Sequence, residues 1–243
     1  MTKGLLYVVF GSQCDLIASH CVKYSRQFTN IPILVLTNIP EESRNKLWKN
    51  IPDVEFKYFN KPITDNRQLK TTCIRHTIFD KTIYLDADSI VQKSNIETLF
   101  DQIDNTILVN PFCDFEFGKK VPNIYLEAIK RFKLKSPLHV YNGAFIGFEK
   151  TPEAEIFFNK WNEIWIKFGR NREMPCLAAT FQKVEIKPTK LMKGVFAPDT
   201  KKPDAIIQHQ YNKDFSTRVG LKTQVHLPMQ STKVTDFRFN IWK

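Results

Sequence analysis

The sequence is poor in glycine and lacks the glycine patterns that commonly bind nucleotide phosphates. Only 8 of the 243 residues are glycine. None of them forms a Gly-x-Gly-x-x-Gly or a Gly-x-x-x-x-Gly-Lys-Ser/Thr pattern, so a dinucleotide-binding fingerprint and a P-loop are excluded. No apolar run approaches about 20 residues, so we expect no transmembrane helix. Any nucleotide that this protein binds must be held in another way.

The cysteines argue against a disulfide-stabilised secreted protein. There are 5 of them, an odd number, and no Cys-x-x-Cys pair is present. Scattered cysteines of this kind are typical of reduced thiols in a cytosolic protein. Residues 1–10 lack the long apolar segment and the small-residue cleavage site of a signal peptide. We therefore expect a cytoplasmic protein, and the sequence leaves its oligomeric state open.

The composition is that of a globular protein with a substantial core. Hydrophobic residues make up 42% of the chain and charged residues 25%, which is the usual balance for such proteins. Strand-like segments at 5–10, 31–36 and 54–59 alternate with segments of helical periodicity at 14–24 and 41–48. This alternation predicts an α/β fold, with a mixed, mainly parallel sheet flanked by helices.

Four residues lie at the ends of the first two predicted strands. Phe10, Gly11 and Ser12 close the first strand, and Thr37 follows the second. Ligands of α/β sheets bind at the carboxyl ends of the strands. We therefore expect these four residues to lie beside a bound ligand, and they are the candidates for holding the base and ribose if that ligand is a nucleotide.

Segment 82–91 carries the most specific chemical signal. It begins as a β-branched and aromatic run, which predicts a buried strand, and continues with Asp86 and Asp88. Side chains two residues apart on an extended chain point the same way, so both carboxylates can face one point, directly or through a tight turn. Neighbouring buried carboxylates need a cation, and hard oxygen ligands suit Mg²⁺ or Mn²⁺. The alternative is an Asp-rich turn that caps the next helix.

Two other residues extend this predicted metal site. His209 follows an apolar pair and could ligate the ion through one ring nitrogen, although a histidine at a strand end is often only hydrogen-bonded. Lys70 lies on a helix predicted over 66–76 and could reach a diphosphate, or it could be an ordinary solvated lysine. The aromatic-rich helix predicted at 152–168 is most simply a core helix.

The order of these motifs resembles the glycogenin-like family eight of the GT-A glycosyltransferases. The helix with Lys70, the run 79–91 and the short helix predicted at 96–101 are similar to the family's nucleotide-sugar-binding segment. Looser matches extend the likeness over residues 5–213. They are Tyr141-Asn142-Gly143, Glu173-Met174 in the place of the family's Asp-Gln, and Ile206-Ile207-Gln208-His209.

The resemblance implies a GT-A fold and the transfer of a sugar from a nucleoside-diphosphate sugar, UDP-linked in this family, to an acceptor hydroxyl. It assigns Mn²⁺, or Mg²⁺, to Asp86, Asp88 and His209, and it places Ala87 among the residues that bind the sugar nucleotide. It also favours retention of anomeric configuration, which the sequence alone does not settle. The remaining residues that it implies are Asn142 and Gly143 in the sugar pocket, Glu173 beside the sugar and the acceptor hydroxyl, and Lys213 on a phosphate.

We expect a single domain, 1–243, composed of a nucleotide-sugar-binding half, 1–110, and an acceptor-side half, 111–243, with a basic C-terminal region. Residues 1–118 carry 13 Lys and Arg against 14 Asp and Glu, whereas residues 119–243 carry 23 against 11, a net charge of +12. The basic half either meets an anionic acceptor, such as a charged glycan or modified DNA, or is a solvated surface beside a neutral glycan or protein acceptor. Its candidate contact residues are Lys187, Lys190, Lys193, Lys201 and Lys202.

Two other functions remain open. The Asp86-x-Asp88 pair also fits the opening of a haloacid-dehalogenase-type phosphatase, in which Asp86 would be the nucleophile. That motif normally follows the first strand, whereas three predicted strands precede it here. The second alternative is a basic nucleic-acid-binding module, although the sequence has no helix-turn-helix, zinc-finger or aromatic RNA-binding signature.

Overall fold

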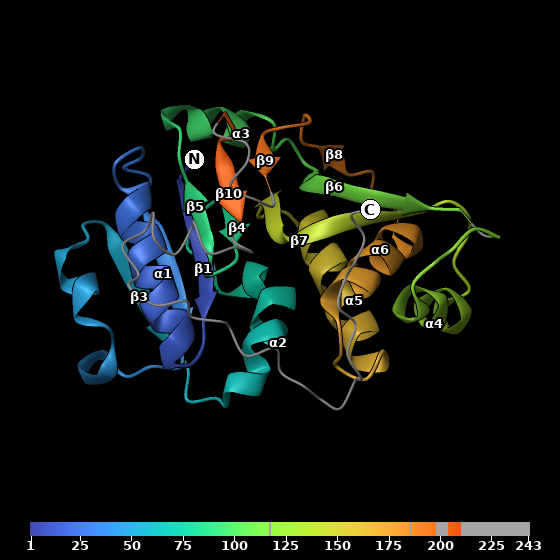
Figure 1. Ribbon diagram of the computed structural model, residues 1–243, viewed down its shortest axis with the longest axis horizontal. Coiled ribbons are helices and arrows are strands. Elements are labelled where there is room, and N and C mark those ends of the chain that lie inside the picture. The colour runs from blue at the N-terminus through green and yellow to red at the C-terminus, as the bar shows by residue number, and fades with distance from the viewer. Residues whose placement is uncertain (117, 185, 198–203, 210–243) are drawn as a thin grey trace.

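A computed structural model describes residues 1–116, 118–184, 186–197 and 204–209. Within them, a seven-stranded sheet in the order β3-β2-β1-β4-β7-β6-β8 is covered by helices on its two faces (Figure 1). The helices are α1 (Ser12–Ser25), α2 (Asn66–Thr71), α3 (Glu97–Asp101), α4 (Asn123–Phe132), α5 (Pro152–Lys167) and α6 (Glu173–Lys183). The strands of this sheet are β1 (Lys3–Val9), β2 (Ile33–Thr37), β3 (Val54–Tyr58), β4 (Lys81–Leu85), β6 (Ile107–Phe115), β7 (Leu138–Glu149) and β8 (Thr189–Lys190).

The sheet is mixed, as the sequence predicts. Strands β3, β2, β1 and β4 run parallel to one another, whereas β7 is antiparallel to both β4 and β6. The central strands are apolar on both faces because helices cover both. Leu6 and Val8 belong to one hydrophobic cluster and Leu5 and Tyr7 to the other, so alternate residues of β1 serve opposite faces.

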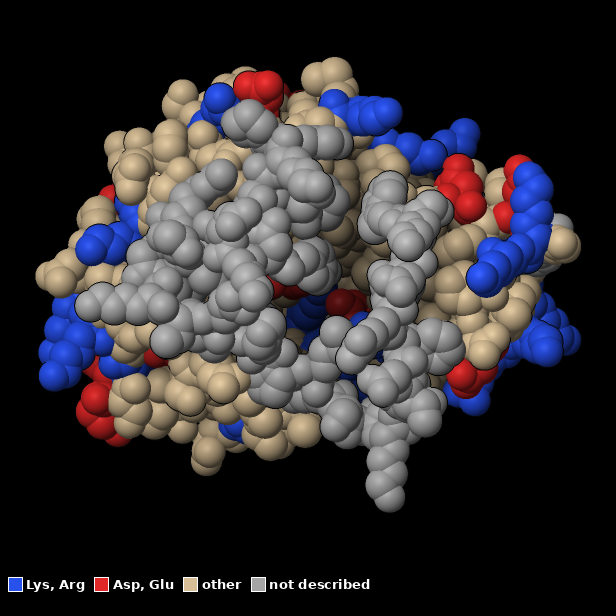
Figure 2. Space-filling model, viewed as in Figure 1, with Lys and Arg blue, Asp and Glu red and all other residues tan. Residues whose placement is uncertain are grey.

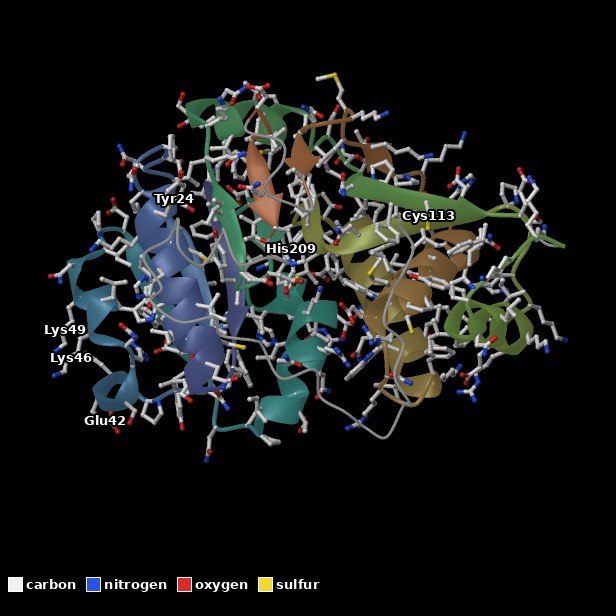
Figure 3. All side chains as sticks on the ribbon, viewed as in Figure 1. Tyr24, Glu42, Lys46, Lys49, Cys113 and His209 are labelled. Carbon is white, nitrogen blue, oxygen red and sulfur yellow. The ribbon has the colours of Figure 1, made fainter. Side chains whose placement is uncertain are left out.

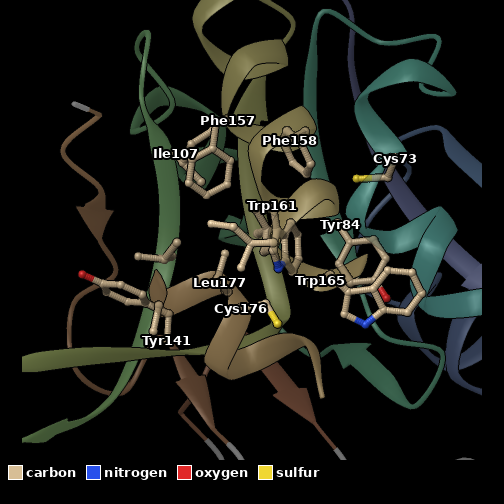
Figure 4. Packing of buried hydrophobic residues seen from close by; sticks show 14 of the residues in the cluster. Cys73, Tyr84, Ile107, Tyr141, Phe157, Phe158, Trp161, Trp165, Cys176 and Leu177 are labelled. Carbon is tan, nitrogen blue, oxygen red and sulfur yellow. The ribbon is translucent and has the colours of Figure 1, made fainter. Parts of the chain in front are cut away.

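Helix α5 is a core helix, as predicted. Its buried residues include Phe157, Phe158, Trp161 and Trp165, and Figure 4 shows these rings packed in one cluster with Tyr84 of β4. Thr151 caps the N-terminus of this helix, because its hydroxyl accepts a hydrogen bond from the Ala154 amide. Helix α5 also contacts α2 and α6, so its packing helps to position both of those helices.

A second, three-stranded sheet is built from β5 (Ser89–Val91), β10 (Ile207–His209) and β9 (Phe196–Ala197). Strand β10 is antiparallel to β5 and parallel to β9, and His209 lies opposite Ser89. The small sheet therefore brings a late segment of the chain beside the residues that directly follow β4.

Two predicted helices differ from the structure. The helix expected at 41–48 is instead two 3-10 helices, Glu41–Ser43 and Lys46–Asn50. They are separate because Arg44 is extended and the Asn45 side chain caps a new turn. The helix expected at 66–76 stops at Thr71, and a 3-10 helix follows at Cys73–Arg75. The hydroxyls of Thr71 and Thr72 both donate to the Gln68 carbonyl, which offers the backbone an alternative to continued helix.

Strands from both predicted halves lie in one sheet, and β6 itself runs across residue 110. The division into a donor half and an acceptor half stays a prediction. Among the described residues, no helix is both long enough and apolar enough to cross a membrane.

We predict that Gly4→Ala destabilises the fold, because β1 leaves no room for a side chain there. A Cβ at this position would lie 2.1 Å from two ring carbons of Phe79. Forcing extra atoms into a packed core lowers the free energy of unfolding by about 1–3 kcal/mol. Urea denaturation would measure the loss, and Phe79→Leu in the Gly4→Ala background should recover part of it. An unchanged denaturation midpoint in the single mutant would contradict this account.

Candidate metal and sugar-nucleotide site

The chain turns sharply after β4, and this turn carries both aspartates. The Asp86 amide donates to the Ala144 carbonyl of β7 at 3.1 Å, and the Ser89 amide donates to the Asp86 carbonyl at 2.9 Å. The second bond closes a tight turn between β4 and β5. The two carboxylates therefore lie at the carboxyl end of β4, where α/β sheets bind ligands.

His209 faces both aspartates from β10. Its Nε2 lies 3.0 Å from Asp88 Oδ1 and 3.8 Å from Asp86 Oδ2. One potential ligand atom from each of the three residues lies within 4.8 Å of the other two. The sequence predicts this group, and the structure brings it together although His209 is more than a hundred residues from the aspartates in the chain.

The two oxygens of Asp86 have different partners. Oδ1 accepts hydrogen bonds from Tyr84 Oη at 2.6 Å and from Lys70 Nζ at 2.9 Å. Oδ2 is directed at His209. Two carboxylate oxygens and one imidazole nitrogen are suitable ligands for Mn²⁺ or Mg²⁺. The donor set therefore fits a divalent cation, with Oδ2 as the ligand atom of Asp86.

Lys70 is the centre of an ion-pair network. Its side chain is only 5% exposed, and its Nζ also donates to Glu173 Oε1 at 3.1 Å. Burial lowers the pKa of Lys70, but the charges of Asp86 and Glu173 raise it by more, so its pKa lies above the usual range. Arg67, one helical turn earlier, reaches the other oxygen of Glu173 at 3.4 Å. Lys70 thus holds two carboxylates, where the sequence suggests a contact to phosphate.

Glu173 and Gly143 lie next to this lysine. Glu173 is in the first turn of α6, and its backbone carbonyl accepts a hydrogen bond from Trp161 Nε1 at 3.3 Å. A Cβ at Gly143 would lie 3.3 Å from Lys70 Nζ and 3.5 Å from Glu173 Oε1. The absence of a side chain at this position therefore leaves the room that the ammonium group occupies.

Asn142 is buried, and its side-chain oxygen accepts a hydrogen bond from the Ala144 amide at 2.9 Å. Its oxygen thereby shapes the part of β7 that faces the aspartates. Ala87 is also buried within the turn. Lys213, Lys201 and Lys202 lie outside the described residues.

The predicted base and ribose residues divide into two pairs. Phe10 and Thr37 are buried, and the Thr37 hydroxyl accepts a hydrogen bond from the Ile39 amide at 3.0 Å. Gly11 is half-buried and Ser12 is exposed, and Gly11 has a φ of 86°, which favours glycine. The Gly11 amide donates to Asn38 Oδ1 at 2.9 Å. Phe10 and Thr37 therefore support this region from below, and Gly11 and Ser12 form its surface.

Sequence reasoning did not single out Tyr84 or Arg67 as site residues. Both nevertheless carry a readable signal. Tyr84 is two residues before Asp86, so it shares a strand face with it, and Arg67 is three residues before Lys70 on one helix face. Acidic and basic side chains meet in a hollow near the middle of the face in Figure 2, the region in which Figure 3 labels His209.

Comparison with known proteins identifies the fold. No protein-family model matches the sequence. The galactosyltransferase LgtC, in complex with donor and acceptor sugar analogues, is similar with a TM-score of 0.63 and 12% identity, over 93% of this chain and 98% of its own. Mouse xyloside xylosyltransferase 1 is similar with a TM-score of 0.58 and 11% identity, over 86% and 98% of the two chains. The chain therefore has the GT-A glycosyltransferase fold.

Two other similarities are more partial. The glycosyltransferase GlyE of Streptococcus pneumoniae is similar with a TM-score of 0.57 and 17% identity, over 88% of this chain and 56% of its own. The uncharacterized protein R707 of Acanthamoeba polyphaga mimivirus is 26% identical over an alignment of 197 residues, and the match covers 67% of this chain and 69% of that protein.

The surroundings of His209 predict how pH affects it. Burial lowers its pKa, but Asp88 first and Asp86 next raise it by more, so the pKa lies above the usual value of 6.5. In the metal-free protein this contact stabilises the fold fully below about pH 6.5, and the contribution is lost as the pH rises through the folded-state pKa. A cation needs the neutral imidazole, so protonation competes with metal binding.

We therefore predict that Mn²⁺ affinity of the wild type falls about ten-fold per pH unit below the pKa of His209. His209→Ala should bind Mn²⁺ more weakly at pH 8 and show a flatter pH profile, because the remaining ligands are carboxylates. Titration calorimetry between pH 5.5 and 8.5 measures both profiles. Parallel profiles for the two proteins would remove His209 from the metal site.

Proposed function

We propose that this protein is a metal-dependent glycosyltransferase, which moves a sugar from a UDP-linked donor to an acceptor hydroxyl. The observation that carries the proposal is the Asp86-Asp88-His209 group, whose ligand atoms lie within 4.8 Å of one another at the end of β4. A GT-A fold surrounds this group. On the resemblance to family eight, the proposal also includes Lys213 as a residue that contacts a phosphate of the donor.

Asp86, Asp88 and His209 would hold Mn²⁺ or Mg²⁺. When bound, the ion supplies a Lewis acid that offsets negative charge on a diphosphate. Lys70 and Tyr84 keep Oδ1 of Asp86 occupied, so the cation is offered Oδ2. Gly11 and Ser12 would contact the base or ribose, with Phe10 and Thr37 supporting them.

Glu173 would act beside the donor sugar as an anion. Burial raises its pKa, but Lys70 and Arg67 lower it by more, to about 2. A carboxyl group with that pKa is ionised at physiological pH, so it cannot serve as a general acid. It can stabilise positive charge on a sugar or attack it, and either role is compatible with retention of configuration. Asn142 and Gly143 would border the same sugar.

The test is a thermal-shift screen of nucleotide sugars with and without Mn²⁺. A ligand that binds only the folded state at 100 times its Kd stabilises it by about 2.7 kcal/mol. We expect a UDP-sugar to raise Tm only when Mn²⁺ is present. Asp88→Asn should abolish this joint effect, because it removes one charged ligand while keeping the side chain's shape. Asp104→Asn, a change at an exposed carboxylate that accepts a hydrogen bond from Asn105 and makes none of the contacts described for the site, is the matched control.

Other results of the screen would support the alternatives. Hydrolysis of p-nitrophenyl phosphate that needs Mg²⁺ and is lost in Asp86→Asn would favour a phosphatase. No response to any nucleotide sugar, with Mn²⁺ bound, would contradict the glycosyltransferase proposal.

The acceptor is the less defined partner, and the charge distribution supports an anionic one. Lys187, Lys190 and Lys193 are exposed, and Figure 2 shows Lys and Arg side chains along the right edge of this face, the side of α4 and α6 in Figure 1. Exposed charges of this kind are strongly screened by salt. A diphosphate held by a cation at close range is screened much less.

We predict that salt and charge reversal weaken use of the acceptor and leave donor binding nearly unchanged. Replacing Lys187, Lys190 and Lys193 together by Glu should raise the acceptor KM at least about ten-fold, since each exposed pair contributes roughly 0.2–1 kcal/mol and reversal also adds repulsion. The control reverses Lys23, Lys46 and Lys49, exposed lysines of the first half; Figure 3 labels the last two at the left end of the molecule.

Steady-state kinetics at 50 and 300 mM salt would measure both effects. Equal activity of the two triple mutants on a neutral oligosaccharide at high salt would show that the basic half is a solvated surface. Duplex DNA binding without any response to nucleotide sugars would favour the nucleic-acid-binding alternative.

A further inference from the structure

We propose that Tyr84 is a positioning residue of the metal site, whose hydroxyl holds the Asp86 carboxylate so that Oδ2 is the oxygen presented to the cation. The inference rests on the proposed function only in assuming that the Asp86-Asp88-His209 group binds a divalent ion. It concerns a side chain that touches neither the ion nor the donor, and it acts through Asp86.

The geometry divides the two oxygens of Asp86 cleanly. Tyr84 Oη donates to Oδ1 at 2.6 Å, and Lys70 Nζ donates to the same oxygen at 2.9 Å. Oδ2 faces His209 Nε2 at 3.8 Å. The torsion that rotates a carboxylate about its last bond has only broad preferences. The orientation of Asp86 therefore depends on what its oxygens bind, and both donors select the same one.

Tyr84 can orient the Asp86 carboxylate because its backbone is paired with a strand on each flank and its ring is buried. It pairs with Leu6 of β1 and with Ile146 of β7, one on each flank of β4. The residue is only 3% exposed, and its ring belongs to the cluster that contains Trp161 and Trp165 (Figure 4). The phenol is thus a rigid donor on a central strand, whereas Lys70 is a flexible chain that also serves Glu173.

The two donors are not equivalent. Lys70 Nζ lies 2.9 Å from Asp86 and 3.1 Å from Glu173, and its ammonium lies 5.2 Å from the centre of the Tyr84 ring. If the phenol hydroxyl is removed, the ammonium remains the single described donor to Oδ1 and shares its protons with a second carboxylate. Asp86 then gains freedom to rotate, and the ligand set loses its preorganisation.

Tyr7 provides a matched comparison within the same sheet. It lies on β1 opposite Leu85, the residue between Tyr84 and Asp86, and it is fully buried. Its hydroxyl lies near Cys21 and Ser25 of α1 rather than beside the carboxylates. Tyr7→Phe removes the same atom from the same sheet without touching a candidate ligand.

The experiment compares Tyr84→Phe with Tyr7→Phe by titrating each full-length protein with Mn²⁺ alone and following free Mn²⁺ by electron paramagnetic resonance. Loss of a group that orients a ligand typically weakens metal binding 10–100-fold. Since Lys70 remains, we expect about a ten-fold higher Kd for Tyr84→Phe. Tyr7→Phe should bind as the wild type does. A Kd for Tyr84→Phe within about two-fold of the wild-type value would overturn the proposal.

A double-mutant cycle separates positioning from a general loss of structure. In the Asp86→Ala background, which has no side-chain oxygen for the phenol to hold, Tyr84→Phe should change the Mn²⁺ Kd no further, because the residue acts through that carboxylate. Equal and additive losses in both backgrounds would show that Tyr84 only supports the fold, and would overturn the proposal. This comparison holds even if Tyr84→Phe lowers Tm, since both arms share that loss.

The Mn²⁺ readout also keeps this proposal apart from the glycosyltransferase one. Suppose that the effect of Tyr84→Phe on the Mn²⁺ Kd depends on Asp86 as expected, but no nucleotide sugar raises Tm. This result would support the positioning role and contradict the proposed function. Metal-dependent UDP-sugar binding that Tyr84→Phe leaves unchanged, at an unchanged Mn²⁺ Kd, would do the reverse. A wild-type protein that binds no Mn²⁺ would overturn both.

Discussion

The site depends on one buried ammonium group, that of Lys70. Asp86 and Glu173 converge on it from β4 and α6 at 2.9 and 3.1 Å. Without the Lys70 ammonium, the carboxylates of Asp86 and Glu173 would face each other in a poorly solvated region, which is unfavourable. Removing one partner of a buried ion pair typically costs about 3–5 kcal/mol, because the other charge is left uncompensated. Lys70 therefore connects Asp86, a candidate metal ligand, to Glu173.

Several local features of the chain follow from the position of this ammonium. Gly143 has no side chain where a Cβ would come within 3.3 Å of Nζ. Arg67 occupies the other oxygen of Glu173, so each oxygen of that carboxylate has a cationic partner. Glu173 also lies in the first turn of α6, where the helix dipole favours a negative charge. The carboxylates of Asp86 and Glu173 are thus largely compensated by charges of the protein itself.

The sequence predicts the parts of this site that depend on local pattern. The aspartate pair follows from an apolar strand that ends in two carboxylates with one residue between them, and the sheet follows from alternating strands and helices. Burial of Lys70 was not predictable, because a lysine on a short helix has the pattern of a solvated residue. Phe10 and Thr37 are buried because helices cover both faces of the strands that they end, and their place beside a base or ribose stays a prediction. Pairing of β5 with a three-residue β10 depends on contacts between distant segments, which local patterns do not specify.

The placement of His209 has a consequence for how the site is held together. Asp86 ends a strand of the large sheet, whereas His209 belongs to the small sheet, whose strands are two or three residues long. Few backbone hydrogen bonds can support such short strands. The contact of 3.0 Å between His209 and Asp88 adds a side-chain link between β10 and the turn that precedes β5. A cation held by all three ligands would join the two sheets at the same point, so its binding energy would also stabilise the late segment of the chain. The candidate metal site would in this sense be part of the fold as well as of the chemistry.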